Sequence, residues 1–182
     1  MTTEKKPRPS ILTNYTWPGD CPPYPHQKEL ADSLCRLRRV MRVMIDAPLG
    51  VGAVASTLWA ADWLMTRKRV RKALILSSLF ARDRVWGNSV SEVLPHRGWM
   101  PVYGNVDQRI ESLTAPVDFF VMNHAGVTMQ PLVDTIRRRL DIDLIIVDDA
   151  KVVTSLRTQR KKQTECFWSM VRDNQRVWLL NR

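Results

Sequence analysis

The chain has 182 residues, 45% of them apolar, which is enough for one domain with a sizeable core. Its 28 lysines and arginines exceed its 18 aspartates and glutamates, and the resulting formal net charge of +10 favours a polyanionic or acidic partner. No apolar run has membrane-spanning length, so no membrane partner is expected. The cysteines (Cys21, Cys35, Cys166) and the histidines have no metal-ligand spacing, so no metal is expected. The odd number of cysteines and the polar N-terminus predict a cytoplasmic protein.

The N-terminal residues 1–23 are rich in proline, threonine and lysine, a composition that predicts a flexible arm. A helix is expected from Tyr24 to about Arg39, with three leucines on one face. A short apolar strand follows at 42–46, and helical spacing of apolar residues predicts a second helix over 54–67. Residues 24–182 are therefore expected to form one folded unit.

Four further apolar runs predict strands at 72–78, 117–123, 143–148 and 176–181. Helical stretches are expected between them, at about 80–94, 129–140 and 158–172, and residues 100–103 are expected to add an edge strand. Strands that alternate with helices predict an α/β fold whose central sheet is mostly parallel and covered by helices on both faces.

Residues 47–54 read Ala-Pro-Leu-Gly-Val-Gly-Ala-Val and have the spacing of a phosphate-binding loop. In that motif, backbone N–H groups cradle phosphates, a lysine reaches the β- and γ-phosphates, and a hydroxyl ligates Mg²⁺. Gly50 and Gly52 are present, but Ala53 replaces the lysine and Val54 replaces the threonine. The alternative is an ordinary strand-to-helix turn that happens to contain two glycines.

The order of six segments resembles the first RecA-like lobe of superfamily-two helicase-like ATPases, especially the Swi/Snf type. The resemblance covers nearly the whole chain from Tyr24 and predicts a single RecA-like domain without the second lobe. The segments are Tyr24 to Gln27, residues 47–54, Leu74 to Ser78 followed by Trp86, Phe120 to His124, Leu144 to Lys151, and Arg176 to Asn181.

The resemblance implies roles for several positions and shows where this sequence departs from the family. The family's glutamine at Gln27 contacts adenine, and its aspartate at Asp148 helps to hold magnesium. The glutamate that polarises the attacking water is replaced by the shorter Asp149, and Lys151 replaces a histidine. A misplacement of roughly 1 Å costs about a hundredfold in rate.

The expected nucleotide site is therefore vestigial, and we expect no ATP hydrolysis by the chain alone. No cofactor is expected, although weak binding of ATP and Mg²⁺ through Gln27 and the two glycines stays open. The vestigial catalytic positions are Asp148 and Asp149, and the vestigial nucleotide-binding positions are Gln27, Gly50, Gly52, Ala53 and Val54.

Basic residues cluster mostly near the ends of expected helices, where cations also favour the helix dipole. The functional alternative is a surface that binds DNA or RNA phosphates without sequence preference. Trp86 and Trp99 could stack on bases, but core positions are more common for tryptophan. The candidate nucleic-acid-binding residues are Arg67, Lys68, Arg69, Arg71, Lys72, Arg157, Arg160, Lys161 and Lys162; further clusters are Arg36, Arg38, Arg39 and Arg42, and Arg137, Arg138 and Arg139.

Three functional hypotheses follow. The favoured one is a protein-interaction or inhibitor module that imitates half of a helicase and binds a helicase complex or host factor, as would suit a virus or mobile element. The second is a lobe that binds DNA or RNA independently of nucleotide. The third is an ATPase that another chain completes.

Overall fold

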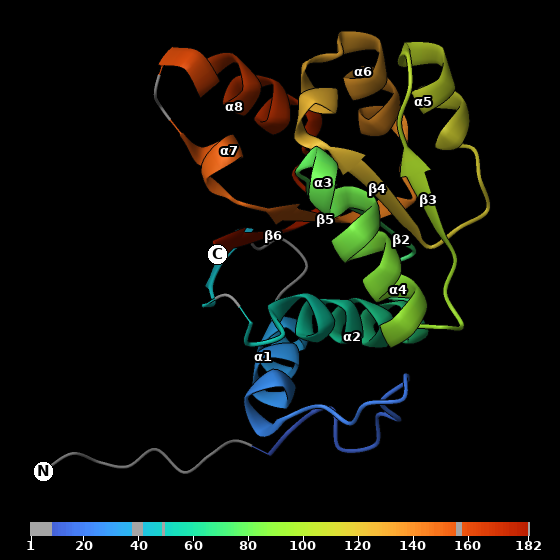
Figure 1. Ribbon diagram of the computed structural model, residues 1–182, viewed down its shortest axis with the longest axis vertical. Helices are drawn as coiled ribbons and strands as arrows, with labels where there is room; N and C mark the ends of the chain where they lie inside the picture. Colours follow the sequence, from blue (N-terminus) through green and yellow to red (C-terminus); the bar gives the residue numbers. More distant parts are fainter. Residues whose placement is uncertain (1–8, 38–41, 49, 156–157, 182) are drawn as a thin grey trace, which may run out of the picture.

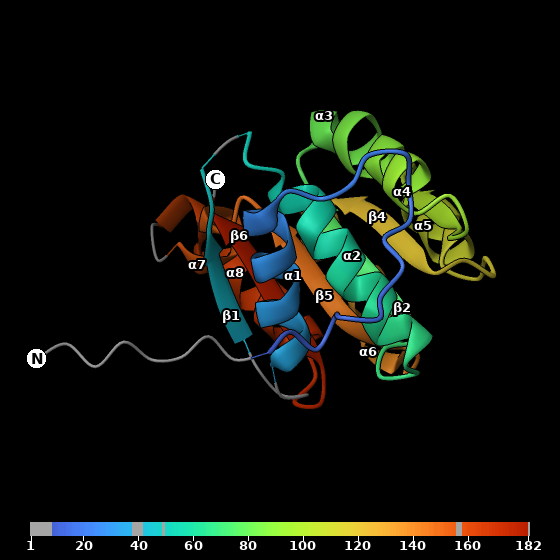
Figure 2. The ribbon, with the colours of Figure 1, turned by 90° about the horizontal axis from the view of Figure 1, so that it is seen from below.

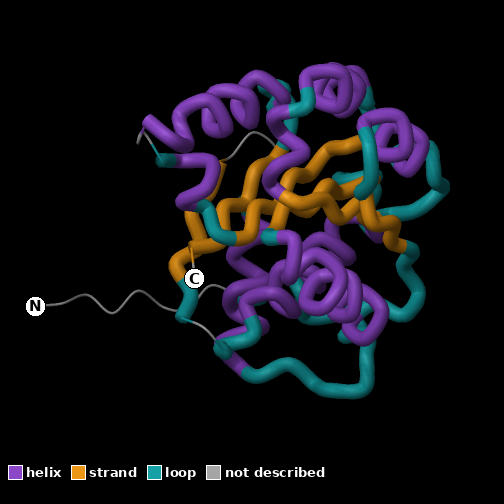
Figure 3. The backbone as a smooth tube through the Cα atoms, turned by 45° about the horizontal axis from the view of Figure 1, so that its top comes forward, coloured by secondary structure: helices purple, strands orange, loops and turns teal. Residues whose placement is uncertain are grey.

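Six parallel strands form the centre of the computed structural model, which describes residues 9–37, 42–48, 50–155 and 158–181. The strand order is β1-β6-β5-β2-β4-β3, so the predicted parallel sheet is confirmed and the expected edge strand lies at one side. Helices lie above and below the sheet (Figure 3). The strands are β1 (Arg42–Asp46), β2 (Lys72–Ser77), β3 (Trp99–Val102), β4 (Phe119–Asn123), β5 (Ile142–Asp148) and β6 (Arg176–Asn181).

The helices divide between the two faces of the sheet (Figure 1). On one face lie α1 (Pro25–Arg36), α2 (Ala53–Thr66) and α4 (Asn88–Val93); on the other lie α5 (Val106–Ser112), α6 (Gln130–Arg138), α7 (Lys151–Thr154) and α8 (Thr158–Met170). Shorter helical segments are α3 (Leu79–Ala81), the π-helix η1 (Arg82–Gly87) and the 3₁₀ helix η2 (His124–Thr128).

Alternating residues of β2, β4, β5 and β6 belong to two separate hydrophobic cores, one on each face of the sheet. On β5, Leu144 and Ile146 join the core under α1 and α2, whereas Ile145 and Val147 join the core under α6 and α8. Every residue of β5 is buried. This two-sided burial explains why the strand is a continuous apolar run in the sequence.

The helix expected over 80–94 forms three consecutive segments, α3, η1 and α4. The π-helical turn at its centre places Trp86 inside the fold, where it is fully buried. The helix α5 was not expected from apolar periodicity. Its signal is a capping box, in which the Asn105 side chain accepts from the Gln108 N–H and the Gln108 side chain accepts from the Asn105 N–H.

Residues 9–23, the described part of the expected N-terminal arm, lie across α2 (Figure 2). The Tyr15 hydroxyl donates a hydrogen bond to the buried Asp62 of α2. Trp17 packs edge-to-face on Trp59 with ring centroids 5.4 Å apart, and Leu12 is buried. Residues 1–8 lie outside the described residues, and the domain boundary at residue 23 stays a prediction.

Within the described residues, no helix combines the length and the apolar character needed to cross a membrane.

Candidate nucleotide site

The two glycines of the loop between β1 and α2 have backbone conformations that favour glycine. Gly50 and Gly52 have φ angles of 85° and 79°, in the left-handed region that favours glycine. Gly52 is also the N-cap of α2, a helix of 14 residues whose first N–H groups carry the positive end of its dipole. The spacing recognised in the sequence therefore corresponds to a genuine strand–glycine turn–helix unit.

The Gln27 side chain lies directly over this loop. Its Nε2 donates to the Val51 carbonyl at 3.3 Å, and its Oε1 accepts from the Tyr24 N–H at 3.0 Å. A Cβ added to Gly52 would lie 1.9 Å from Gln27 Nε2, so any other residue there would displace this side chain, and the φ angle of 79° would strain its backbone. The structure thus brings together three of the predicted positions, Gln27, Gly50 and Gly52.

The next two positions carry no group that can bind a nucleotide's phosphate or metal. Ala53 is the first residue of α2 and is buried, and Val54 follows it with an apolar side chain. The nearest hydroxyls in the helix, those of Ser56 and Thr57, donate to the carbonyls of Gly52 and Ala53 at 3.2 and 2.6 Å. The first turn of α2 therefore offers backbone donors alone.

Asp148, at the carboxyl end of β5, is engaged inside the protein. Its Oδ2 accepts a hydrogen bond of 2.9 Å from the indole N–H of Trp86, and its side chain is only 3% exposed. A carboxylate that holds Mg²⁺ needs an oxygen directed at the ion or its water. Together with the alanine and valine of the loop, this geometry does not fit a bound Mg²⁺–nucleotide.

Asp149 and His124 complete this end of the sheet. Asp149 is exposed, and its φ angle of 56° places its backbone in the left-handed region. His124 Nε2 lies 2.7 Å from the Asp148 carbonyl oxygen. Burial lowers the pKa of His124, and the hydrogen bond to Asp148 opposes that shift in part. The neutral ring donates from Nε2, which fixes its tautomer.

The candidate nucleic-acid-binding residues do not form one surface. Arg67, Lys68, Arg69, Arg71 and Lys72 lie between α2 and the start of β2, at the amino edge of the sheet. Arg160, Lys161 and Lys162 lie in the first half of α8, whose Gln163 donates to the His124 carbonyl at the carboxyl edge. The two groups are thus on opposite edges. Arg157 lies outside the described residues.

The two tryptophans considered for base stacking differ in burial. Trp86 is fully buried, so it cannot stack on a base, and its role in holding Asp148 was missed in the sequence. Trp99 is half-buried, packs against Gly87 and donates to Ser91 Oγ at 3.0 Å. No sequence signal pairs Trp86 with Asp148, because 62 positions separate them.

Among the described residues, no three histidine, cysteine, aspartate or glutamate side chains gather in a way that could hold a metal ion.

No protein-family model matches the chain, and no curated protein is significantly similar to it in sequence. Among solved structures, it is similar to the Sulfolobus solfataricus SWI2/SNF2 ATPase core in complex with dsDNA, with a TM-score of 0.69 and 14% sequence identity. The match covers 87% of this chain and 31% of that chain. The chain spans less than a third of the length of that structure and has the fold of a SNF2-like RecA-like lobe.

Proposed function

We propose that this helicase-like lobe hydrolyses no ATP and acts by binding another protein, a helicase-type ATPase whose complex it joins or blocks. The observation that supports the absence of ATP hydrolysis is the hydrogen bond from the Trp86 indole N–H to the Asp148 carboxylate. It engages one oxygen of the carboxylate that would help to hold magnesium in an ATPase, and Ala53 stands where the phosphate-binding amine would be.

An exposed apolar patch supports the second half of the proposal. The patch consists of Leu79, Phe80 and Tyr103, which are 67%, 68% and 56% exposed. All three directly follow the carboxyl ends of β2 and β3, the same edge of the sheet as the nucleotide loop. Arginines stack on its two aromatic rings, Arg84 on Phe80 and Arg82 on Tyr103, each 5.0 Å from the ring centroid.

This composition is that of a protein interface. Aromatic residues and arginine are enriched at the centres of such interfaces and dominate their binding energy. A second RecA-like lobe would cover the same edge, and a lobe from another chain is the partner that the position of the patch favours. The similar structure is itself an ATPase core, which agrees with a partner of helicase type.

The test uses the natural chain and the double variant Leu79→Ser/Phe80→Ser as baits in a lysate of cells in which the chain naturally occurs. The proposal expects the natural chain to capture a helicase-type ATPase, the double variant to lose it, and the bait to release no phosphate from Mg-ATP. Ile11→Ser, which alters another exposed apolar residue, is the control and should retain the ATPase. Capture that survives the double variant, or a strictly solitary bait, contradicts the proposal.

A second candidate function is the binding of nucleic acid. The net charge of +10 favours it, and the similar SWI2/SNF2 ATPase core is in complex with dsDNA. The specific observation behind it is the arrangement of basic side chains at the amino edge of the sheet.

A further inference from the structure

The amino edge of the sheet carries a band of basic side chains around two neighbouring hollows. The larger hollow, of about 720 Å³, lies between the ends of α1 and α2 and the starts of β2, β5 and β6. The smaller one, of about 520 Å³, lies between α6 and the turn after α8. Three aspartates line the hollows, against eight basic residues that we call the amino-edge band: Arg36, Lys68, Arg69, Arg71, Arg137, Arg138, Arg172 and Arg176.

Part of the band is neutralised inside the protein and part is not. Arg71 forms a two-pronged pair with Asp143, with both contacts at 2.9 Å. In contrast, no carboxylate of the described residues lies within ion-pair distance of Lys68 or Arg69. Both side chains are exposed, so their charge faces solvent at the rim of the larger hollow.

Trp63 holds the neighbouring guanidinium groups in place. Arg67 and Arg69 both lie over its ring, each 5.3 Å from the centroid. Stacking on an aromatic ring orders an arginine while leaving its N–H groups directed outward. These cations are therefore partly preorganised for an external anion.

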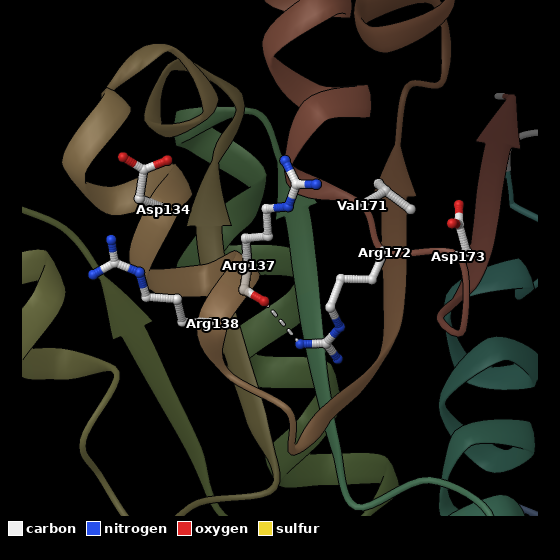
Figure 4. A pocket seen from close by; sticks show the side chains of 6 residues that line it. All are labelled: Asp134, Arg137, Arg138, Val171, Arg172 and Asp173. Atoms are coloured by element: carbon white, nitrogen blue, oxygen red, sulfur yellow. Dashed lines mark hydrogen bonds between the residues drawn. The ribbon is translucent and has the colours of Figure 1, made fainter.

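The smaller hollow is built around Arg172 (Figure 4). Its guanidinium donates to the carbonyls of Arg137 at 3.0 Å, Ile142 at 2.8 Å and Arg139. Burial lowers the pKa of Arg172; the negative charge of Asp143 opposes this shift, and the positive charge of Arg71 adds to it. The side chains of Arg137 and Arg138 are exposed beside it, so the band continues from one hollow to the other.

We propose that the amino-edge band binds the phosphate backbone of nucleic acid; this rests on the second candidate function and assigns it a site. The band follows the starts of β6, β5 and β2, three neighbouring strands about 4.8 Å apart. It therefore spans about 10 Å, the axial length of about three successive phosphates of one duplex strand.

The chemistry of the band favours a phosphate chain over a single small anion. Three of its exposed members, Arg69, Arg137 and Arg138, are arginines, whose forked donors match phosphate oxygens. Several separate cations along a line suit a ligand with several separate charges. The site lies opposite the nucleotide loop, so nucleic acid can bind there while a protein covers the apolar patch at the carboxyl edge.

The test measures binding of a fluorescent 20-base-pair duplex, and of one of its strands, by polarisation at several salt concentrations. The band variant is Lys68→Asn/Arg69→Gln/Arg138→Gln, in which asparagine suits the left-handed backbone of Lys68. The matched control is Arg160→Gln/Lys161→Gln/Lys162→Gln, which removes the same charge at the opposite edge. Circular dichroism establishes that both variants remain folded.

For the duplex, the slope of log K against log salt should be about −3 for the natural chain. The band variant should lose at least about tenfold in affinity and about two to three units of slope, whereas the control should lose much less. Absence of binding to duplex and single strand at low salt overturns the second candidate function together with the site. Equal losses in the two variants overturn the site alone, as does equally tight binding of poly-glutamate or of anionic vesicles.

Discussion

At the residue scale, the nucleotide site is altered at Ala53 and Val54 in the loop and at Asp148, which accepts a hydrogen bond from Trp86. Ala53 and Val54 are visible in the sequence as replacements of the lysine and threonine of a phosphate-binding loop. The bond from Trp86 to Asp148 is not visible, because a π-helical turn and the register of β5 together create it. An aspartate can therefore keep its position in a sequence motif while its carboxylate forms a hydrogen bond with a buried side chain.

The contact between Trp86 and Asp148 predicts a large loss of stability in Trp86→Phe. The substitution removes this donor from a buried carboxylate, and the loss of such a buried hydrogen bond costs about 1–3 kcal/mol, with the smaller ring adding to the loss. Trp99→Phe, which removes a bond to the exposed Ser91, is the control and should cost less than about 1 kcal/mol. Urea unfolding measures both, and equal losses would contradict a structural role for the bond.

His124 predicts the pH dependence of folding. Its pKa in the folded chain lies below the ordinary value of 6.5, because burial disfavours the charged ring. The unfolded chain therefore takes up a proton first, and stability should fall as the pH drops through about 6.5 towards 5. Aspartates titrate mainly below this window. The free energy of unfolding of His124→Gln should fall less over the same range; an unchanged dependence would exclude His124 as its cause.

At the element scale, long apolar patterns are the most informative. The strands were predictable because most of them are apolar runs between polar turns, and β1 and β6 have the predicted bounds. The helix over 80–94 was not predictable in detail, since burial of Trp86 reshapes its middle. The short α5 has too few residues for periodicity and is marked by its cap alone.

The segment 9–23 is an element without regular secondary structure whose position depends on Asp62. Burial and the Asp62 carboxylate raise the pKa of Tyr15, so its hydroxyl stays a donor at any ordinary pH. Tyr15→Phe should therefore lower stability by about 1–2 kcal/mol, even though His96 and Arg97 still contact Asp62. Tyr103→Phe, at an exposed ring, should change stability by less than about 0.5 kcal/mol in the same urea titration. A Tyr15→Phe variant as stable as Tyr103→Phe would show that the segment contributes nothing through this bond.

At the scale of the whole molecule, the alternation of strands and helices in the sequence predicts the fold. It does not predict which residues share a surface. Sequence clusters of basic residues suggested one nucleic-acid surface, but chain direction in a parallel sheet sends them to opposite edges. The amino edge gathers cations from junctions far apart in the sequence, and the carboxyl edge combines the altered nucleotide loop with an apolar patch. Only the three-dimensional arrangement separates these two faces.

The central proposal is that this lobe has lost its use for ATP, and calorimetry of Mg-ATP binding tests it most directly. We expect no measurable binding heat for the natural chain at concentrations up to about 1 mM, and gain of binding in Ala53→Lys/Val54→Thr, which restores the amine and the hydroxyl on an intact loop. Micromolar, magnesium-dependent binding by the natural chain would contradict the account.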